Sequence, residues 1–424
     1  MHGTAELIFT GDELLRGDIV NTNQAFLGES LLDIGMFTTH ALSVTDDLDA
    51  IAAALQAALI RRPDVVIISG GLGPTEDDLT REAVSSALGQ PLEHHDELLQ
   101  QIRIRFVQLG IHMGDSNRKQ ALIPEGATAI PFTGTAPGFW LVSGDTVVAA
   151  LPGVPRELAS MWAETVEPLL TSRLREAEAK EGRPQQGVIV RRLRVYGIGE
   201  STLAELLGEI PWRGHGVDIG TRAAMDGVTL ILRAQHTAEA RATLALIEEQ
   251  VRDILGTKIY GTGDADLAGV VGSLLRDRGL TVSTAESCTG GLVAKRLTDI
   301  PGSSDYFLGG VVAYDNRLKT ALLDVEPALL EKHGAVSEEV AAAMAVGACG
   351  RLGTDCAIST TGIAGPGGGS TEKPVGLVYI GTAIGDDVQV RSFTMFRTRE
   401  EIRIRTAQTA LDLFRRRFLD PLDR

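Results

Sequence analysis

The sequence predicts an α/β protein that contains a doubly wound sheet and more than one domain. In the N-terminal part, β-type runs alternate with helix-type segments, with strands expected at 6–10 and 37–44 and helices at 22–33 and 46–62. Residues 64–69 form a continuous apolar run, which is typical of a parallel strand buried on both faces. A chain of 424 residues also exceeds what one hydrophobic core usually supports.

Changes in composition divide the chain into three segments. Residues 1–170 carry the alternating pattern, which continues with a strand at 146–151. The charged, helix-prone stretch 171–186 indicates a linker. Residues 187–261 alternate strand, helix, two strands, helix and a short strand, which predicts a small α+β module. Residues 264–424 begin with an amphipathic helix and predict a second α/β domain.

The charge balance and the cysteine content limit the possible classes of protein. The chain has 40 basic and 56 acidic residues and a net charge of −16, which disfavours non-specific nucleic-acid binding. The three cysteines, at 288, 349 and 356, have neither a disulfide framework nor CxxC metal spacing. A signal peptide and a run of about twenty apolar residues are both lacking. We therefore expect a cytoplasmic protein without a membrane partner.

The most informative stretch is 280–291, where a β-type run ends in small polar residues before a helix that starts near Leu292. Ser287 lies in this turn and is a candidate nucleophile. The N-terminus of a helix offers N–H groups and the positive end of its dipole, so we expect it to hold a phosphate or an oxyanion. A glycine-rich loop that begins at Thr361 follows another predicted strand and would add backbone donors.

A serine nucleophile needs a base, and histidine is the usual one. His333 is the one histidine of this segment, and its helix-to-loop context favours a structural role. A strand is predicted at 310–314 and ends at Tyr314. Tyr314 and Lys319 suit a Ser–Lys hydrolase better, because a desolvated lysine can deprotonate serine and tyrosine can relay the proton. Cys288 is the rival nucleophile, since its thiol also stands at the predicted helix N-terminus.

A second candidate site lies near the N-terminus, where the apolar run 64–69 ends in a glycine-rich loop that leads into a helix. Two acids close this loop and would repel a phosphate unless a divalent cation stood between them. The alternative is that these acids only stabilise helix N-termini. The predicted phosphate-binding residues are Gly70, Gly71, Gly73 and Thr75, and the predicted metal ligands are Glu13, Asp46, Asp77 and Asp78.

The C-terminal segment closely resembles the nicotinamide-nucleotide amidase (PncC/CinA C-terminal) family. The resemblance implies hydrolysis of nicotinamide mononucleotide to nicotinate mononucleotide and ammonia without a cofactor. It also implies that Ser287 is the nucleophile and that Tyr314 and Lys319 activate it. The motifs that carry it are 284–291, 314–319, 333–337, 362–366 and 372–376. The substrate-binding residues predicted for this domain are Thr289, Gly290, Gly291, Thr361, Gly362, Gly365, Arg399 and Arg403.

The rest of the chain resembles the other domains of full-length CinA proteins. The N-terminal part is similar to the molybdopterin-binding (MoaB/MogA-like) superfamily, and the middle segment to the small KH-like module of the family. The resemblance implies an ADP-ribose pyrophosphatase that depends on a divalent metal such as Mg²⁺, Mn²⁺ or Co²⁺. The N-terminal motifs are 11–15, 70–78, 120–126, 134–139 and 151–155.

Together these observations predict a bifunctional enzyme of pyridine-nucleotide salvage. Its partners would be nicotinamide mononucleotide and ADP-ribose, and a homodimer is expected. Two alternatives remain open. One is a molybdopterin-binding enzyme with an inactive C-terminal domain, and the other is a competence-associated DNA-binding protein that uses the middle module. The acidic net charge argues against the second alternative.

Overall fold

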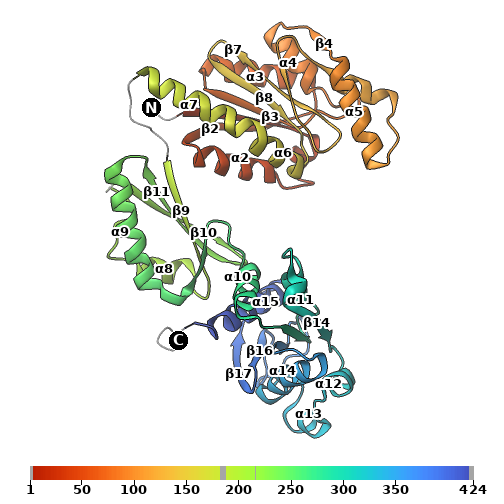
Figure 1. The fold of residues 1–424 in the computed structure, drawn as a ribbon, viewed down its shortest axis with the longest axis vertical. Helices are drawn as coiled ribbons and strands as arrows, with labels where there is room; N and C mark the ends of the chain where they lie inside the picture. The colour runs from red at the N-terminus through yellow and green to blue at the C-terminus, as the bar shows by residue number, and fades with distance from the viewer. Residues whose placement is uncertain (1–2, 182–187, 215, 420–424) are drawn as a thin grey trace. The chain divides into compact units, whose positions relative to one another are not determined.

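The computed structural model describes residues 3–181, 188–214 and 216–419. The described chain divides into two compact units (Figure 1). One unit comprises Met1–Ile189 with Ala234–Arg241, and the other comprises Val190–Arg233 with Ala242–Arg424. Of the predicted linker, 171–181 belongs to helix α7 (Glu167–Glu181), whereas 182–186 lies outside the described residues.

The first unit is built on a six-stranded sheet in the order β2-β1-β3-β8-β7-β6. The first four strands of this order pair in parallel, as the alternating pattern predicted, but β7 and β6 are antiparallel, so the sheet is mixed. The strands are β1 (Gly3–Thr10), β2 (Met36–Val44), β3 (Val65–Ser69), β6 (Thr128–Ile130), β7 (Gly138–Ser143) and β8 (Thr146–Leu151).

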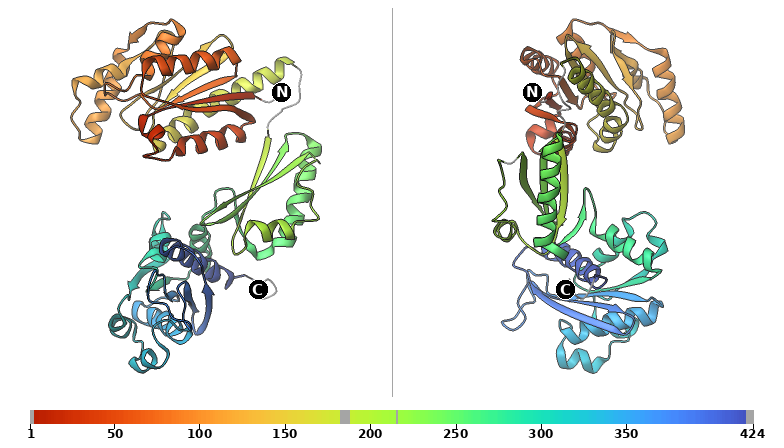
Figure 2. Two further views of the ribbon diagram at one scale, coloured as in Figure 1. Left: turned by 180° about the vertical axis from the view of Figure 1, so that it is seen from behind. Right: turned by 60° about the vertical axis from the view of Figure 1, so that its left-hand side comes forward.

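Helices cover both faces of this sheet because alternate residues of its strands face opposite sides (Figure 2). Ile8 and Ile68 pack with α3, α4 and α5, whereas Leu7 and Ile67 pack with α2, α6 and α7. The helices are α1 (Asp12–Arg16), α2 (Thr22–Asp33), α3 (Leu48–Arg61), α4 (Thr80–Leu88), α5 (Asp96–Leu109) and α6 (Pro155–Met161). The remaining elements are β4 (Leu92–His94) paired with β5 (Leu122–Pro124), the 3₁₀ helix η1 (Asp115–Ala121) and the π-helical turn η2 (Trp162–Val166).

The middle segment has the predicted order of strand, helix, two strands, helix and short strand. Its four strands form one sheet in the order β10-β11-β9-β12. The elements are β9 (Val188–Val195), α8 (Glu200–Leu206), β10 (Val217–Ala224), β11 (Gly227–Gln235), α9 (Ala238–Leu255), η3 (Gly256–Lys258) and β12 (Ile259–Thr262).

The C-terminal part has a five-stranded sheet in the order β14-β13-β15-β16-β17, with the first three strands parallel and the last two antiparallel. Helix α14 packs on one face, and α10 and α15 pack on the other. The strands are β13 (Val282–Glu286), β14 (Phe307–Val312), β15 (Cys356–Gly362), β16 (Leu377–Ile384) and β17 (Asp387–Thr394). The helices are α10 (Leu267–Arg278), α11 (Leu292–Thr298), η4 (Ser303–Asp305), α12 (Asn316–Leu323), α13 (Pro327–His333), α14 (Glu338–Leu352) and α15 (Arg399–Arg416).

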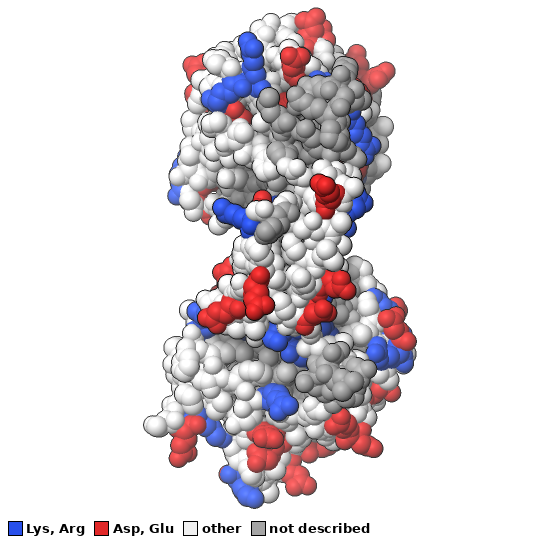
Figure 3. Space-filling view, turned by 90° about the vertical axis from the view of Figure 1, so that its left-hand side faces the viewer, with Lys and Arg blue, Asp and Glu red and all other residues white. Residues whose placement is uncertain are grey.

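The distribution of surface charge and the character of the helices both agree with the acidic, mixed composition of the chain. On the face drawn in Figure 3, acidic and basic side chains are interspersed without one continuous basic patch. Within the described part of the chain, no helix combines the length and the apolar character that crossing a bilayer requires.

Candidate functional site

A cavity of about 230 Å³ opens at the carboxyl ends of β13, β14 and β15. In parallel sheets, ligands bind beyond this end of the strands, because the following turns meet there. The three predicted catalytic side chains all line this cavity. Its lining residues are Ser287, Cys288, Tyr314, Asn316, Lys319, Ala335, Val336, Thr361, Gly362, Ala364 and Arg399.

Ser287 stands directly after β13 and is 8% exposed. Its backbone N–H donates to the Thr360 carbonyl at 2.9 Å, which joins the turn to the end of β15. Gly290 and Gly291 follow with φ values of +61° and +93°, a conformation that glycine adopts at little cost. The turn therefore places the serine hydroxyl in the cavity from a fixed strand end.

Lys319 lies on the first turn of α12 and is only 1% exposed. Its Nζ donates to the Ala313 carbonyl at 3.0 Å and to the Tyr314 carbonyl at 3.4 Å. Burial lowers the pKa of this amine, and the nearby Asp315 carboxylate opposes the shift only in part. A neutral amine can keep two such hydrogen bonds and still offer its lone pair to a proton.

Tyr314 and Arg399 form the rim of the cavity. Tyr314 is 60% exposed, and its hydroxyl accepts a hydrogen bond from Arg399 Nη2 at 3.0 Å. Arg399 Nη1 donates to the Gly365 carbonyl at 2.5 Å, which fixes the guanidinium beside the glycine-rich loop. A fork-shaped cation at the mouth of a cavity suits an anionic group such as a phosphate monoester.

Cys288 also lines the cavity, but its chemistry differs from that of a reactive cysteine. Burial raises the pKa of its thiol to about 12, and the nearby Glu286 carboxylate adds to the effect. The thiolate is the reactive form of cysteine, so this thiol is almost entirely unreactive at neutral pH. The structure therefore favours Ser287 over Cys288 as the nucleophile.

Three N–H groups at the N-terminus of α11 are already bound within the protein, which corrects the prediction that the turn 287–291 would offer them to a ligand. The buried Glu286 carboxylate accepts the N–H groups of Gly291, Val293 and Ala294 at 2.8–3.1 Å. The Thr289 hydroxyl donates to the same carboxylate at 2.7 Å. An internal anion thus occupies the place where we expected a phosphate or an oxyanion.

Replacing Glu286 by alanine should destabilise the C-terminal domain strongly. Its backbone donors would lose their acceptor, and each buried unpaired donor costs about 1–3 kcal/mol, so we expect a loss of about 3 kcal/mol or more. Hydrogen–deuterium exchange of β13 and α11 across a urea series measures this loss. Glu331→Ala, on an exposed part of α13, is the control. Equal exchange in the two variants would contradict the assigned role of Glu286.

Of the eight predicted substrate-binding residues of this domain, Thr361, Gly362 and Arg399 line the cavity. The other five do not, and Arg403 Nη2 instead donates to the Thr289 carbonyl at 2.9 Å, which supports the turn that contains Ser287. The five residues outside the lining are Thr289, Gly290, Gly291, Gly365 and Arg403. The prediction omitted the lining residues Asn316, Ala335, Val336 and Ala364, although all four lie within motifs that carry the family resemblance.

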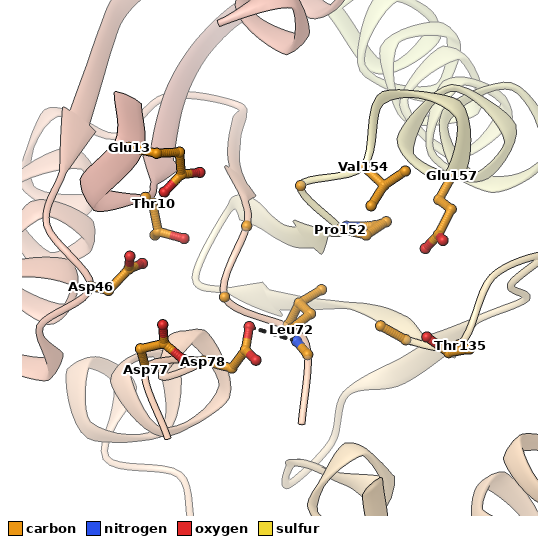
Figure 4. Close-up of a pocket in the computed structure, with 16 residues that line it drawn as sticks. Thr10, Glu13, Asp46, Leu72, Asp77, Asp78, Thr135, Pro152, Val154 and Glu157 are labelled. Carbon is orange, nitrogen blue, oxygen red and sulfur yellow. Dashed lines mark hydrogen bonds between the residues drawn. The ribbon is translucent and has the colours of Figure 1, made fainter. Parts of the chain in front are cut away.

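A second cavity, of about 310 Å³, lies in the first unit at the carboxyl ends of β1, β3 and β8 (Figure 4). It contains all the predicted residues of the N-terminal site except Thr75. Its lining residues are Thr10, Gly11, Glu13, Asp46, Gly70, Gly71, Leu72, Gly73, Asp77, Asp78, Thr135, Ala136, Pro152, Gly153, Val154 and Glu157.

Most of the backbone N–H groups that were predicted to bind phosphate in the glycine-rich loop of this cavity are hydrogen-bonded within the protein. The N–H groups of Gly73 and Thr75 both donate to the Asp78 carboxylate at 2.8 Å. The Gly70 N–H donates to the Leu151 carbonyl at 3.0 Å. Asp78 therefore holds the loop together, and the role of metal ligand predicted for it competes with these hydrogen bonds.

The other predicted metal ligands form an acidic wall, made of Glu13, Asp46 and Asp77 (Figure 4). The pKa of Asp46 is raised, first by burial and then by the charges of Glu13, Asp12 and Asp77. A cation in the cavity would relieve this repulsion. Among the described residues, however, no three His, Cys, Asp or Glu side chains are grouped closely enough to hold a metal ion by themselves.

The prediction missed three polar lining residues of the second cavity. Among the described residues, the buried Thr10 hydroxyl has no hydrogen-bond partner, so it is available to a ligand. Thr135 lies within the motif 134–139, which offered a signal for it. Glu157 lies just beyond the motif 151–155, in the first turn of α6, and nothing in its spacing indicated that it would reach the cavity.

Three consecutive parts of the chain match known families. Residues 6–172 match the family described as "Probable molybdopterin binding domain", residues 190–261 match "Damage-inducible protein CinA KH domain", and residues 264–418 match "CinA C-terminal domain". The protein is therefore a mixed α/β protein with a molybdopterin-binding-like domain, a KH-like domain and a CinA C-terminal domain.

Two relatives match this chain over almost their whole length. A CinA-like protein from Trichormus variabilis is 46% identical over 430 residues, which cover 98% of this chain and 99% of the relative. A CinA-like protein from a Nostoc species is 44% identical over 439 residues, with the same two coverages. The chain belongs to the CinA family, as the motifs predicted. The crystal structure of a competence/damage inducible protein from Agrobacterium tumefaciens is 46% identical, covering 35% of this chain and 90% of that one, with a TM-score of 0.34.

Proposed function

We propose that the C-terminal domain hydrolyses the carboxamide of nicotinamide mononucleotide to give nicotinate mononucleotide and ammonia. The observation that carries this proposal is the cavity that joins a serine, a buried lysine and an arginine. The buried lysine is suited to act as the general base, and the arginine is suited to bind a phosphate monoester. The same lining includes the apolar side chains of Ala335, Val336 and Ala364, which suit contact with an aromatic ring.

The proposed reaction begins when Ser287 Oγ attacks the carboxamide carbon and its proton passes to the neutral Lys319 amine. The C–N bond then breaks, and the proton returns to the leaving nitrogen, so that ammonia departs and an acyl-serine ester remains. Water attacks this ester with Lys319 again as the base, which releases the carboxylate product and restores the serine. In this proposal Tyr314, whose hydroxyl accepts a hydrogen bond from Arg399, relays the proton at the rim.

One incubation tests this function. Purified full-length protein is mixed with nicotinamide mononucleotide and with ADP-ribose, and ammonia and AMP are measured. Ammonia release from the mononucleotide supports the amidase. Its absence at high protein concentration would overturn the proposal.

We further propose that the N-terminal domain hydrolyses ADP-ribose to AMP and ribose 5-phosphate. The supporting observation is the cavity that combines a glycine-rich loop with the acidic wall. Glu13, Asp46 and Asp77 fit a divalent cation as an incomplete ligand set, because Mg²⁺-type ions are commonly held by one or two carboxylates together with substrate phosphates and water. Such an ion would neutralise the diphosphate and supply an activated water.

Chelation should separate the two activities. With excess EDTA, AMP release from ADP-ribose is expected to stop, because the acidic wall would repel the diphosphate, whereas ammonia release should stay unchanged. Adding Mg²⁺ or Mn²⁺ should restore the first activity. If AMP release persists in EDTA, the metal role assigned to the acidic wall is wrong.

Titration calorimetry distinguishes ADP-ribose from the ligand named by the matching family. We expect binding of ADP-ribose in the presence of Mg²⁺. Binding of molybdopterin in preference to ADP-ribose would support the alternative of a molybdopterin-binding enzyme.

A further inference from the structure

The wall of the N-terminal cavity that faces the acidic wall carries a single carboxylate, that of Glu157 (Figure 4). It comes from the first turn of α6, beside the loop that follows β8. Thr135, Pro152 and Val154 flank it in the lining. Glu157 is thus separated from the predicted metal ligands by the space in which a substrate would lie.

The loop at Gly134 and the side chain of Arg105 both lie next to the Glu157 carboxylate. This carboxyl group rests against Gly134, and a Cβ at residue 134 would force this side chain to shift. The loop of Gly134 is itself fixed, because Arg105 donates to the carbonyls of Thr133 and Gly134. Burial raises the pKa of Glu157, and the Arg105 charge opposes this rise only in part. The carboxylate is therefore a stronger base than an exposed glutamate.

We propose that Glu157 is the general base of the N-terminal reaction and takes the proton of the water that attacks the diphosphate. This inference rests on the proposed pyrophosphatase function. As the water oxygen bonds to one phosphorus, its proton passes to a Glu157 carboxylate oxygen. The bond between that phosphorus and the bridging oxygen breaks, and the bridging oxygen leaves as part of the other phosphate. The products are AMP and ribose 5-phosphate, and Glu157 then returns its proton to solvent.

The acidic wall is less suited to this task. A cation on this wall would lower the basicity of the carboxylates that bind it, and Asp78 is bound to the loop amides. Within the described part of the chain, Glu157 makes no hydrogen bond to the glycine-rich loop. A base on the opposite wall can therefore act on the water while the acidic wall and its ion hold the diphosphate.

The test compares Glu157→Gln with a matched control, Glu164→Gln, an exposed residue farther along the same helical segment. With Mg²⁺ and ADP-ribose, Glu157→Gln should lower kcat for AMP release about 100-fold or more, the range of general-base catalysis, with little change in KM. Calorimetric affinity for ADP-ribose and ammonia release from nicotinamide mononucleotide should both stay unchanged. Glu157→Asp should recover part of kcat, and Glu164→Gln should behave as the wild type.

Each other outcome overturns the inference. If the wild type and the Glu157→Gln variant are equally active, the role of Glu157 is wrong but the proposed function of the domain stands. The same holds if the variant loses affinity for ADP-ribose together with kcat, since Glu157 would then serve binding. A wild type that releases no AMP in any divalent metal overturns the proposed function of the N-terminal domain, and this inference with it.

Discussion

Replacing Ser287 by alanine is expected to lower the rate of ammonia release from nicotinamide mononucleotide by about 10⁴-fold or more, the typical effect of removing a nucleophile. The side chain lies in the cavity with Lys319, and the acyl intermediate cannot form without its oxygen. The variant should fold normally, because its backbone hydrogen bond to the Thr360 carbonyl does not involve the hydroxyl. Unchanged AMP release from ADP-ribose would show that the rest of the chain is intact.

The neighbouring cysteine provides the matched control for this experiment. Cys288→Ala should retain ammonia release within a few-fold, because the thiol is protonated at neutral pH. If Ser287→Ala kept the activity and Cys288→Ala lost it, the nucleophile would be Cys288. Thr289 is poorly suited to replace Ser287 as the nucleophile, since its buried hydroxyl is bound to Glu286 and lies 2.6 Å from the Thr360 hydroxyl.

The sequence identified the strands that build both sites, because these strands have distinctive patterns. Residues 64–69 were expected as a buried strand and form β3, and the predicted strand 146–151 is β8. Strand direction was harder to predict, since an apolar run on a covered sheet looks the same in either direction. The antiparallel β7 was missed altogether, and the strand predicted at 310–314 ends at Val312 in the structure.

The sequence could not show which anion occupies a glycine-lined turn. Both sites were expected to offer backbone N–H groups to a phosphate, and in both an internal carboxylate takes them. Glu286 does so at the start of α11, and Asp78 does so in the loop after β3. The same partial positive charge attracts an internal carboxylate and an external phosphate, so the residue types alone do not distinguish them.

If the C-terminal cavity binds a phosphate, as we propose, its side chains rather than the backbone donors of α11 would recognise the anion. Arg399 is the permanent cation of its lining, and the described lining residues include no Asp or Glu. Arg399 also contacts the glycine-rich loop and the Tyr314 hydroxyl, so a ligand phosphate at the guanidinium would be placed close to the rim. The buried end of the cavity is then left for the carboxamide, next to Ser287 and Lys319.

Replacing Lys319 by methionine or by arginine is the second change with a large expected effect. Methionine removes the amine, and arginine keeps a cation that cannot give up its proton. Either variant should reduce ammonia release about 10³-fold or more, within the range of general-base catalysis. Lys332→Met, at an exposed lysine of α13, is the control and should retain full activity. Full activity of Lys319→Arg would exclude the base role, because a permanently charged side chain cannot accept the serine proton.

The dependence of the amidase on pH tests the same base without a mutation. Lys319 accepts a proton only when neutral, so kcat/KM should rise with pH while the amine is protonated and level off above its pKa. Because burial lowers this pKa from its ordinary value of 10.5, the rate should level off at a lower pH than it would with an exposed lysine. Initial rates of ammonia release between pH 6 and about 10 measure the profile, with AMP release followed in parallel as a check on integrity. A rate that falls with pH over this range would mean that the charged lysine is the active form, and the mechanism would then need another base.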